Sequence, residues 1–118
     1  MDGSAAAERL TVEVSVMPSV VVVAPIGELD NDTADLLRER LGLCLGTHPG
    51  RIIVDCSQLR FCDSTGLNVL LATRLQAEAS GTRMSMAEPT STVSRLFALT
   101  GVDAVFEIYA TVAEAVRP

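Results

Sequence analysis

The chain has 118 residues, which is enough for one domain with a substantial core. Hydrophobic residues make up 48% of it but aromatic residues only 3%, so the core must be aliphatic. The net charge is -6 and every basic residue is an arginine, which argues against partners rich in phosphate, such as nucleic acid or an anionic membrane surface. A protein partner or a small ligand remains.

The beginning of the chain carries no targeting signal that we can identify. Residues 1–8 are predicted to be a flexible tail, with the domain spanning 9–118. An acidic residue at position 2 and the lack of a basic stretch argue against a secretory signal, and no apolar run reaches the length of a membrane span. Three cysteines in apolar contexts suit reduced thiols. We therefore expect a cytoplasmic protein.

The first half of the domain is predicted to hold three strands and one helix. Alternating apolar residues predict a half-buried strand over 10–16, and a continuous β-branched run predicts a buried strand over 20–26. Pro25 should end or bulge this second strand, because proline cannot donate to a ladder. Capping side chains at 30–33 then precede a helix with an apolar face. A buried strand follows at 51–56.

The second half is predicted to alternate helices and strands. A helix over about 64–80, with Leu67, Leu70, Leu71 and Leu75 on one face, precedes a strand at 83–87. A helix over 91–100, a strand over 105–109 and a closing helix over 111–117 complete the chain. The order predicts a single α/β domain in which about four helices pack on a mixed sheet of four to five strands.

The loops after the second, third and fourth predicted strands should emerge at one end of the sheet. They comprise residues 27–30, 62–65 and 88–90, and ligands of open α/β sheets favour this end. His48 should lie at the opposite end, so a serine–histidine hydrolase is not expected. A phosphate-binding loop is excluded by the absence of lysine, and the cysteines lack the spacing of a zinc site. We expect no metal, no cofactor and no enzymatic activity.

The turn Asp63-Ser64-Thr65-Gly66 is the most unusual local sequence. If Asp63 caps the helix, Ser64 occupies its first position and its hydroxyl should face solvent. Capping alone could explain the two hydroxyls, whereas Gly66 breaks a local rule, since glycine costs a helix roughly 1 kcal/mol relative to alanine. Such a glycine indicates that another group approaches closely. A phosphate on this turn would add about -1.5 to -2 charges and could repel a docked partner.

Three stretches resemble the STAS-domain anti-sigma factor antagonists of bacteria, across about residues 10–115. They read VAPIGELDNDTADLL (23–37), IIVDCSQLRFCDSTGLNVLL (52–71) and STVSRLFALTGVDAVFEI (91–108). The second stretch is the most specific, because an Asp-Ser-Ser/Thr-Gly-Leu run after an apolar strand is that family's phosphorylation motif.

The resemblance implies a partner-switching regulator. The unphosphorylated protein would bind an anti-sigma factor that is also a serine kinase, and so release a sigma factor. Phosphorylation at Ser64, preferred over Thr65, would end the binding, and a serine phosphatase would reset it. The expected partner-binding and switch residues are Asp30, Thr33, Asp63, Thr65, Gly66 and Leu67.

Two other functions stay open at this point. Some STAS domains are accessory subunits of ABC-type lipid-transport systems, which need no phosphorylatable serine. A small-molecule sensor is a third class, supported only by the loop-end geometry of α/β sheets. Cys62 beside the motif could be redox-sensitive, although a buried, inert thiol is the preferred interpretation.

Overall fold

The strands and helices follow the predicted order, with one strand added. The computed structural model describes residues 9–118, so the predicted tail at 1–8 lies outside the described residues. The elements are β1 (Leu10–Met17), β2 (Val20–Leu29), α2 (Ala34–Leu45), β3 (Arg51–Asp55), β4 (Leu59–Cys62), α3 (Ser64–Ala79), β5 (Arg83–Ala87), α4 (Ser91–Thr100), the short 3-10 helix η1 (Val102–Ala104), β6 (Ile108–Tyr109) and α5 (Val112–Ala115).

The strands form one mixed sheet, in the order β1-β2-β3-β5-β6. β1 runs antiparallel to β2, and the remaining neighbours are parallel. β4 lies off this path and extends the pairing of β2 beyond the end of β3. The predicted α/β class and mixed sheet are confirmed, with six strands rather than four to five.

β2 continues past Pro25, where the sequence suggested that it should end. The strand reaches Leu29, and Pro25 pairs with Val12 of β1. On its other side, β3 pairs only with residues 20–23 and β4 pairs from Gly27 onward. The Gly27 N–H donates to the Gln58 carbonyl on that side. Alternate residues of a strand point their N–H groups to the same side, so the position where Pro25 lacks an N–H faces the gap between β3 and β4. The proline therefore interrupts no ladder bond.

Two other strand predictions changed. β4 was missed because its four residues give no clear alternation, with Leu59 and Cys62 buried and the two residues between them exposed. The last strand is shorter than predicted, since β6 contains only Ile108 and Tyr109 and the chain before it turns through η1.

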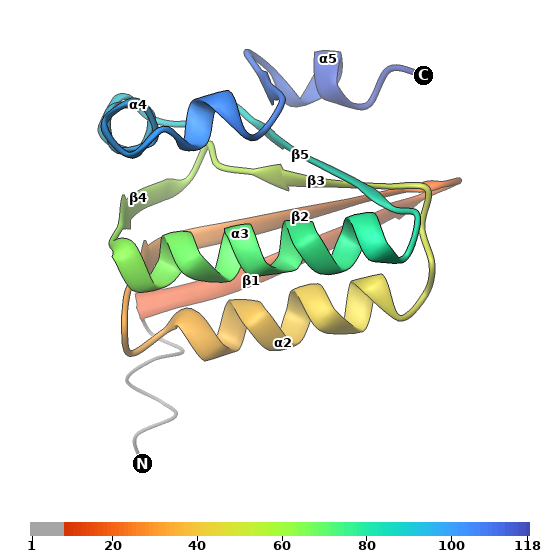
Figure 1. Ribbon diagram of the computed structural model, residues 1–118, viewed down its shortest axis with the longest axis horizontal. Coiled ribbons are helices and arrows are strands. Elements are labelled where there is room, and N and C mark those ends of the chain that lie inside the picture. Colours follow the sequence, from red (N-terminus) through yellow and green to blue (C-terminus); the bar gives the residue numbers. More distant parts are fainter. Residues whose placement is uncertain (1–8) are drawn as a thin grey trace.

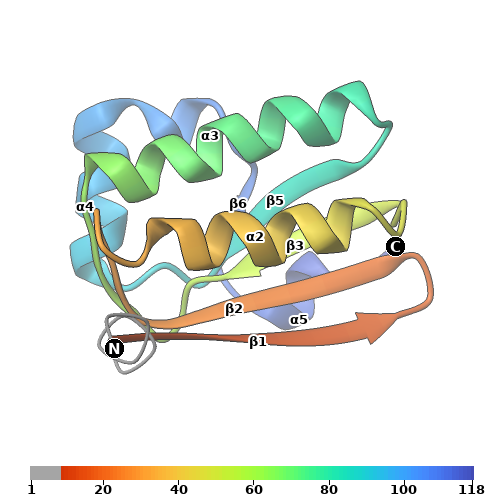
Figure 2. The same ribbon diagram turned by 90° about the horizontal axis from the view of Figure 1, so that it is seen from below.

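The helices cover the two faces of the sheet unequally. Figures 1 and 2 show α2 and α3 side by side across one face, with α5 on the other. The larger core cluster lies beneath α2, α3 and α4, whereas a smaller one joins Ala115 of α5 to Val20, Val22, Ile53 and Ala87. Leu75 was predicted to face the core but is 63% exposed. Between residues 9 and 118, no helix is long and apolar enough to cross a membrane.

β1 forms one edge of the sheet, and a charged side chain covers part of that edge. The Val12–Pro25 pair exchanges no ladder bonds, so the Val12 carbonyl points away from β2. Arg40 of α2 donates from Nη2 to this carbonyl oxygen at 3.2 Å. One of the acceptors that β1 leaves unpaired is therefore satisfied within the chain.

Candidate functional site

The turn between β2 and α2 is closed by the side chains of Asp30 and Thr33. Asp30 Oδ1 accepts from the N–H of Asp32 at 2.9 Å and from the N–H of Thr33 at 3.2 Å. Thr33 Oγ1 accepts from the Asp30 N–H at 2.9 Å and donates to the Glu28 carbonyl at 2.8 Å. Thr33 is fully buried, so its hydroxyl fixes the turn from inside and is not available to a partner.

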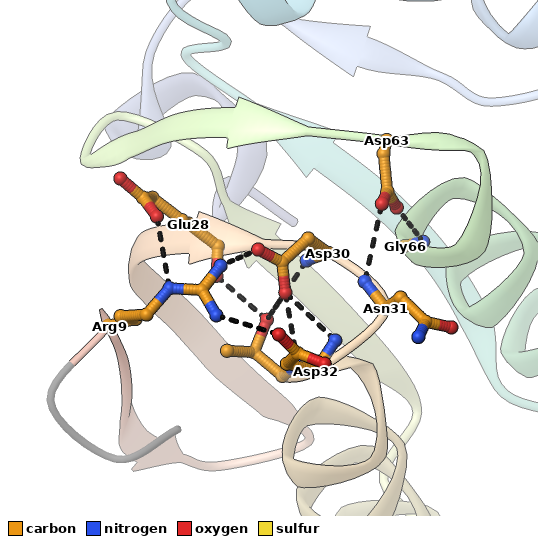
Figure 3. A network of polar contacts seen from close by, with 8 residues as sticks. Arg9, Glu28, Asp30, Asn31, Asp32, Asp63 and Gly66 are labelled. Atoms are coloured by element: carbon orange, nitrogen blue, oxygen red, sulfur yellow. Dashed lines mark hydrogen bonds and ion pairs between the residues drawn. The ribbon is translucent and has the colours of Figure 1, made fainter. Parts of the chain in front are cut away.

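The turn between β4 and α3 is held by Asp63, as predicted. Its extended backbone makes it the N-cap of α3, and Oδ1 accepts from the Gly66 N–H at 3.0 Å. Its second oxygen, Oδ2, accepts from the Asn31 N–H at 3.2 Å. Figure 3 shows this carboxylate bridging the two turns, which come from distant parts of the chain. The Asp63 N–H also donates to the Leu29 carbonyl at 3.1 Å, so the loops at 27–30 and 62–65 emerge at the same end of the sheet, as predicted.

Ser64 is the first residue of α3, and its side chain is exposed. Thr65 beside it is only partly exposed. Because Asp63 supplies the capping oxygen for Gly66, the helix start does not depend on the serine hydroxyl. The serine is thus displayed on a turn that other groups hold in place.

Gly66 and Leu67 face the interior. A Cβ added at Gly66 would lie 2.6 Å from Leu29 Cγ and 3.1 Å from Cys62 Sγ. The close approach predicted at Gly66 is therefore made by the Leu29 side chain of the same protein. Leu67 is 5% exposed and belongs to the main core.

Arg9 is a member of the site that sequence reasoning missed. Its guanidinium pairs with Asp30, and lies 3.2 Å from both Glu28 and Asp32 (Figure 3). Gly27 makes room for the arginine's backbone, since a Cβ there would lie 2.1 Å from the Arg9 carbonyl oxygen. The sequence did contain a clue. Arg9 directly precedes β1, and β1 pairs with the strand that leads into the acidic residues Glu28–Asp32.

The neighbourhood of Ser64 remains acidic despite Arg9. Three carboxylates belong to the two joined turns, namely those of Asp30, Asp32 and Asp63, and Glu28 adds a fourth at the end of β2. Arg9 is the cation that pairs with Glu28, Asp30 and Asp32. Asp63 is held by backbone N–H groups instead. An additional anion at Ser64 would therefore enter a region that already carries excess negative charge.

The cysteine nearest to the site is a buried thiol. Burial, reinforced by the neighbouring Asp63 carboxylate, raises the pKa of Cys62 to about 12. Burial likewise raises the pKa of Cys56 to about 12. All three cysteines are free and buried. Because the thiolate is the reactive form, Cys62 is poorly suited to redox chemistry at neutral pH.

The histidine and the potential metal ligands do not form a second site beside Ser64. His48 lines a hollow with Met17 and Ser19 at the far end of β2, as the sequence predicted. Among the described residues, no three His, Cys, Asp or Glu side chains are grouped to hold a metal ion. Ser64 thus has no histidine beside it to act as a general base.

The fold and this site define a small α/β binding domain that displays a serine at the carboxyl end of its sheet. The chain belongs to the STAS domain family, whose sequence model matches residues 11–115. It is 30% identical over 110 residues to the anti-sigma-F factor antagonist RsfB of Mycobacterium tuberculosis, covering 93% of this chain and 89% of that protein.

Solved structures give the same family. A putative anti-sigma factor antagonist from Thermotoga maritima superposes with a TM-score of 0.82 at 26% identity, covering 88% of this chain and 90% of that one. The anti-sigma factor antagonist SpoIIAA in its unphosphorylated form matches with a TM-score of 0.75 at 27% identity, over 91% and 92% of the two chains. The Bacillus cell fate determinant SpoIIAA in the phosphorylated form matches with a TM-score of 0.69 at 26% identity, over 91% and 96%.

Proposed function

We propose that this protein is an anti-sigma factor antagonist whose binding is controlled by phosphorylation of Ser64. In the unphosphorylated state it binds an anti-sigma factor with serine kinase activity, and this binding frees a sigma factor. The kinase then phosphorylates Ser64 and the complex dissociates. A serine phosphatase restores the binding form. The cycle takes place in the cytoplasm and involves neither nucleic acid nor membrane contacts by this chain.

The observation that carries the proposal is the exposed Ser64 side chain at the first position of α3. A kinase can reach it without opening the core, because the capping bond of this helix comes from Asp63. The relatives named as antagonists, one of them solved in a phosphorylated form, support the same cycle.

Charge explains how one phosphate could end the binding. The phosphate brings about two negative charges and three acceptor oxygens to a turn that is already acidic. The Asp63 side chain keeps that turn in place, and the Asp30 and Thr33 side chains hold the turn bonded to it, so the change acts on the surface and not on the fold. Each 1.4 kcal/mol of lost interaction lowers the affinity tenfold.

The test is a phosphorylation assay with the cognate anti-sigma factor and ATP, with the phosphate located by mass spectrometry. Ser64→Ala should remain unphosphorylated and keep its affinity, whereas Ser64→Asp should bind at least tenfold more weakly. Ser91→Ala is the matched control, because Ser91 is also the exposed first residue of a helix. It should behave as the wild type.

Three outcomes would contradict the proposal. Phosphate on another residue, with a kinase shown to be active, would remove Ser64 from the mechanism. Equal affinities of Ser64→Ala and Ser64→Asp would place the contact surface elsewhere. If affinity purification from cells recovered an ABC-type ATPase, and neither Ser64 variant changed that binding, the lipid-transport accessory role would be favoured.

A further inference from the structure

The end of β1 that leads into the β1–β2 hairpin is an exposed apolar edge of the sheet. β1 is the outermost strand in the strand order, and Figure 2 shows it along the margin of the sheet. Val16 is 78% exposed, and Leu43 of α2 is 69% exposed. Together with Val14, these side chains line a groove of about 290 Å³ between β1 and α2. An apolar strand edge of this kind can pair with a strand of another chain.

The register of β1 decides which backbone groups this edge offers. Val12, Val14 and Val16 occupy alternate positions of the strand, and each points its N–H and C=O groups away from β2. Arg40 already donates to the Val12 carbonyl oxygen at 3.2 Å. A strand that pairs here without displacing the guanidinium is therefore confined to Val14 and Val16.

A second copy of the same edge fits this limit. When two β1 strands run antiparallel about a two-fold axis at Ser15, Val14 of each copy lies opposite Val16 of the other. These opposed residues exchange N–H···O=C bonds in both directions. The same register places Pro18 of each copy opposite the carbonyl that the arginine occupies, and proline has no N–H to donate there. The guanidinium and the second copy therefore do not compete for this carbonyl.

The side chains of this register are also compatible. Val14, Val16 and Leu43 line one groove on the α2 side of the sheet. In the paired arrangement each groove is closed by the same residues of the other copy, so the exposed aliphatic side chains of this edge leave water. On the opposite face each Ser15 meets the serine of the other copy, and this pair places no like charges opposite each other.

Charge does not prevent two copies from meeting at this end of β1. Residues 14–17 are uncharged, although the chain carries a net charge of -6. The acidic turns lie near the other end of β1, where Leu10 pairs with Gly27. At about 3.4 Å per residue, the Leu10 residues of the two copies would be on the order of 30 Å apart. This separation exceeds the Debye length of about 8 Å at physiological salt, so repulsion between the acidic turns is screened.

We propose that two copies of this protein form a symmetric dimer through the β1 edge, with Val14 and Val16 as the paired residues. The contact uses the same surface on both copies, so association stops at the dimer. Figure 2 shows the start of α3, where Ser64 lies, at the end of the molecule opposite the β1–β2 hairpin. The proposed phosphorylation sites of both copies therefore stay accessible, and the dimer does not rest on the proposed function.

Sedimentation velocity over a range of protein concentrations tests the association. The wild type should change from monomer to dimer as its concentration rises. Val16→Arg places a charge in the contact and should raise the dimer dissociation constant at least tenfold. Leu99→Arg is the matched control, because Leu99 is 75% exposed but belongs to α4 and not to the β1 edge. It should change the constant less than twofold, and thermal unfolding verifies that each variant is folded.

Cysteine cross-linking tests the register. Opposed residues that exchange no ladder bonds have Cα atoms about 4.5 Å apart, which a disulfide can bridge. Ser15→Cys should therefore form a disulfide-linked dimer under mild oxidation, while the native cysteines are buried. Glu13→Cys is the matched control, since Glu13 is also exposed and lies on the same face of β1. Its counterpart in the other copy would be roughly 13 Å away, so linkage should be at least tenfold slower.

The dimer and the phosphorylation switch can fail separately. A wild type that stays monomeric at its highest soluble concentration would overturn the dimer, and so would equal linkage rates of Ser15→Cys and Glu13→Cys. A dimer that Val16→Arg leaves intact would place the contact on another surface and overturn the proposal as well. Val16→Arg should still be phosphorylated at Ser64 at the wild-type rate, so a failure of the proposed function is recognised independently of the oligomeric state.

Discussion

Gly66 shows how a single missing side chain links the core to the surface turn. Leu29 is fully buried and occupies the space that a Cβ would need. The glycine lets α3 begin directly against β2, and this close approach places Ser64 at the end of the strand. The local cost of glycine in a helix is thus offset by packing.

Replacing Gly66 by alanine should destabilise the protein by about 1–3 kcal/mol, the usual cost of overpacking a core. Gly42→Ala is the control, because nothing lies within 4 Å of a Cβ at this exposed position of α2. It should stabilise the protein by about 0.5–1 kcal/mol. Urea unfolding measures both, and equal effects of the two variants would contradict the packing explanation.

The buried thiols predict an alkaline loss of stability. The pKa values of Cys56 and Cys62 lie near 12 in the folded protein, above the ordinary 9.0. Above pH 9 the unfolded chain therefore releases protons that the folded chain retains, and stability falls as pH rises toward 12. Each thiol contributes about 1.4 kcal/mol per pH unit in this window.

Urea unfolding between pH 8 and 10.5 tests this prediction. The chain has no lysine, so few other groups titrate in that range. Cys62→Ala should reduce the dependence of stability on pH by one thiol's share. A dependence that is unchanged in this variant would show that the Cys62 thiol does not resist ionisation.

At the scale of single residues, the sequence predicted that Asp63 caps α3 and that Ser64 is its first residue, but not which residues pack around this turn. Capping chemistry is local, and an aspartate before a serine at a helix start is readable directly. The neighbour of Gly66 is Leu29, which lies far away along the chain, and no local pattern could identify it. Arg9 was missed for the same reason.

The two turns of the site act as one structural element, because Asp63 bonds the N–H of Asn31. Arg9, the residue before β1, supports this element through its three carboxylate partners. The first turn of α3 and the turn before α2 are therefore held by the same set of contacts. A substitution of Arg9, just before β1, should therefore loosen the turn that leads into α2.

Arg9→Gln should destabilise the protein by about 1 kcal/mol at low salt, at the upper end for partly exposed ion pairs. The Asp30 side chain is only 16% exposed, which favours a measurable effect. Arg38→Gln, whose partner Asp35 is 85% exposed, is the control and should change little. The difference should shrink in 1 M NaCl, and a salt-independent loss would indicate lost packing instead.

At the scale of elements, periodicity predicted the long helices and strands well and the short strands poorly. α2, α3 and α4 each extend over ten or more residues, and their apolar spacing is visible in the sequence. β4 and β6 contain four and two residues. Such strands exist because a neighbouring strand offers them free backbone groups, and this information is not in their own residues.

The whole molecule carries a net charge of -6, and Glu28, Asp30, Asp32 and Asp63 gather around the two joined turns, with Arg9 as the cation paired with the first three. Its field should attract a basic partner over distances longer than the contacts themselves. Association with the anti-sigma factor should therefore slow by at least tenfold as salt rises from low ionic strength to 0.5 M.

Stopped-flow mixing at several salt concentrations measures this effect. Asp32→Asn should slow association at low salt, and its difference from the wild type should vanish at high salt. An association rate that is indifferent to salt would contradict electrostatic attraction. Asp103→Asn, exposed in η1 and outside the acidic turns, is the matched control.

The contact between Arg40 and the Val12 carbonyl has a consequence for the protein at high concentration. An open strand edge is a template onto which another polypeptide can add itself, and repeated addition produces fibres. A foreign strand that extended to Val12 would have to displace a charged guanidinium before it could pair there. The contact therefore opposes the addition of a further strand at this position of the β1 edge.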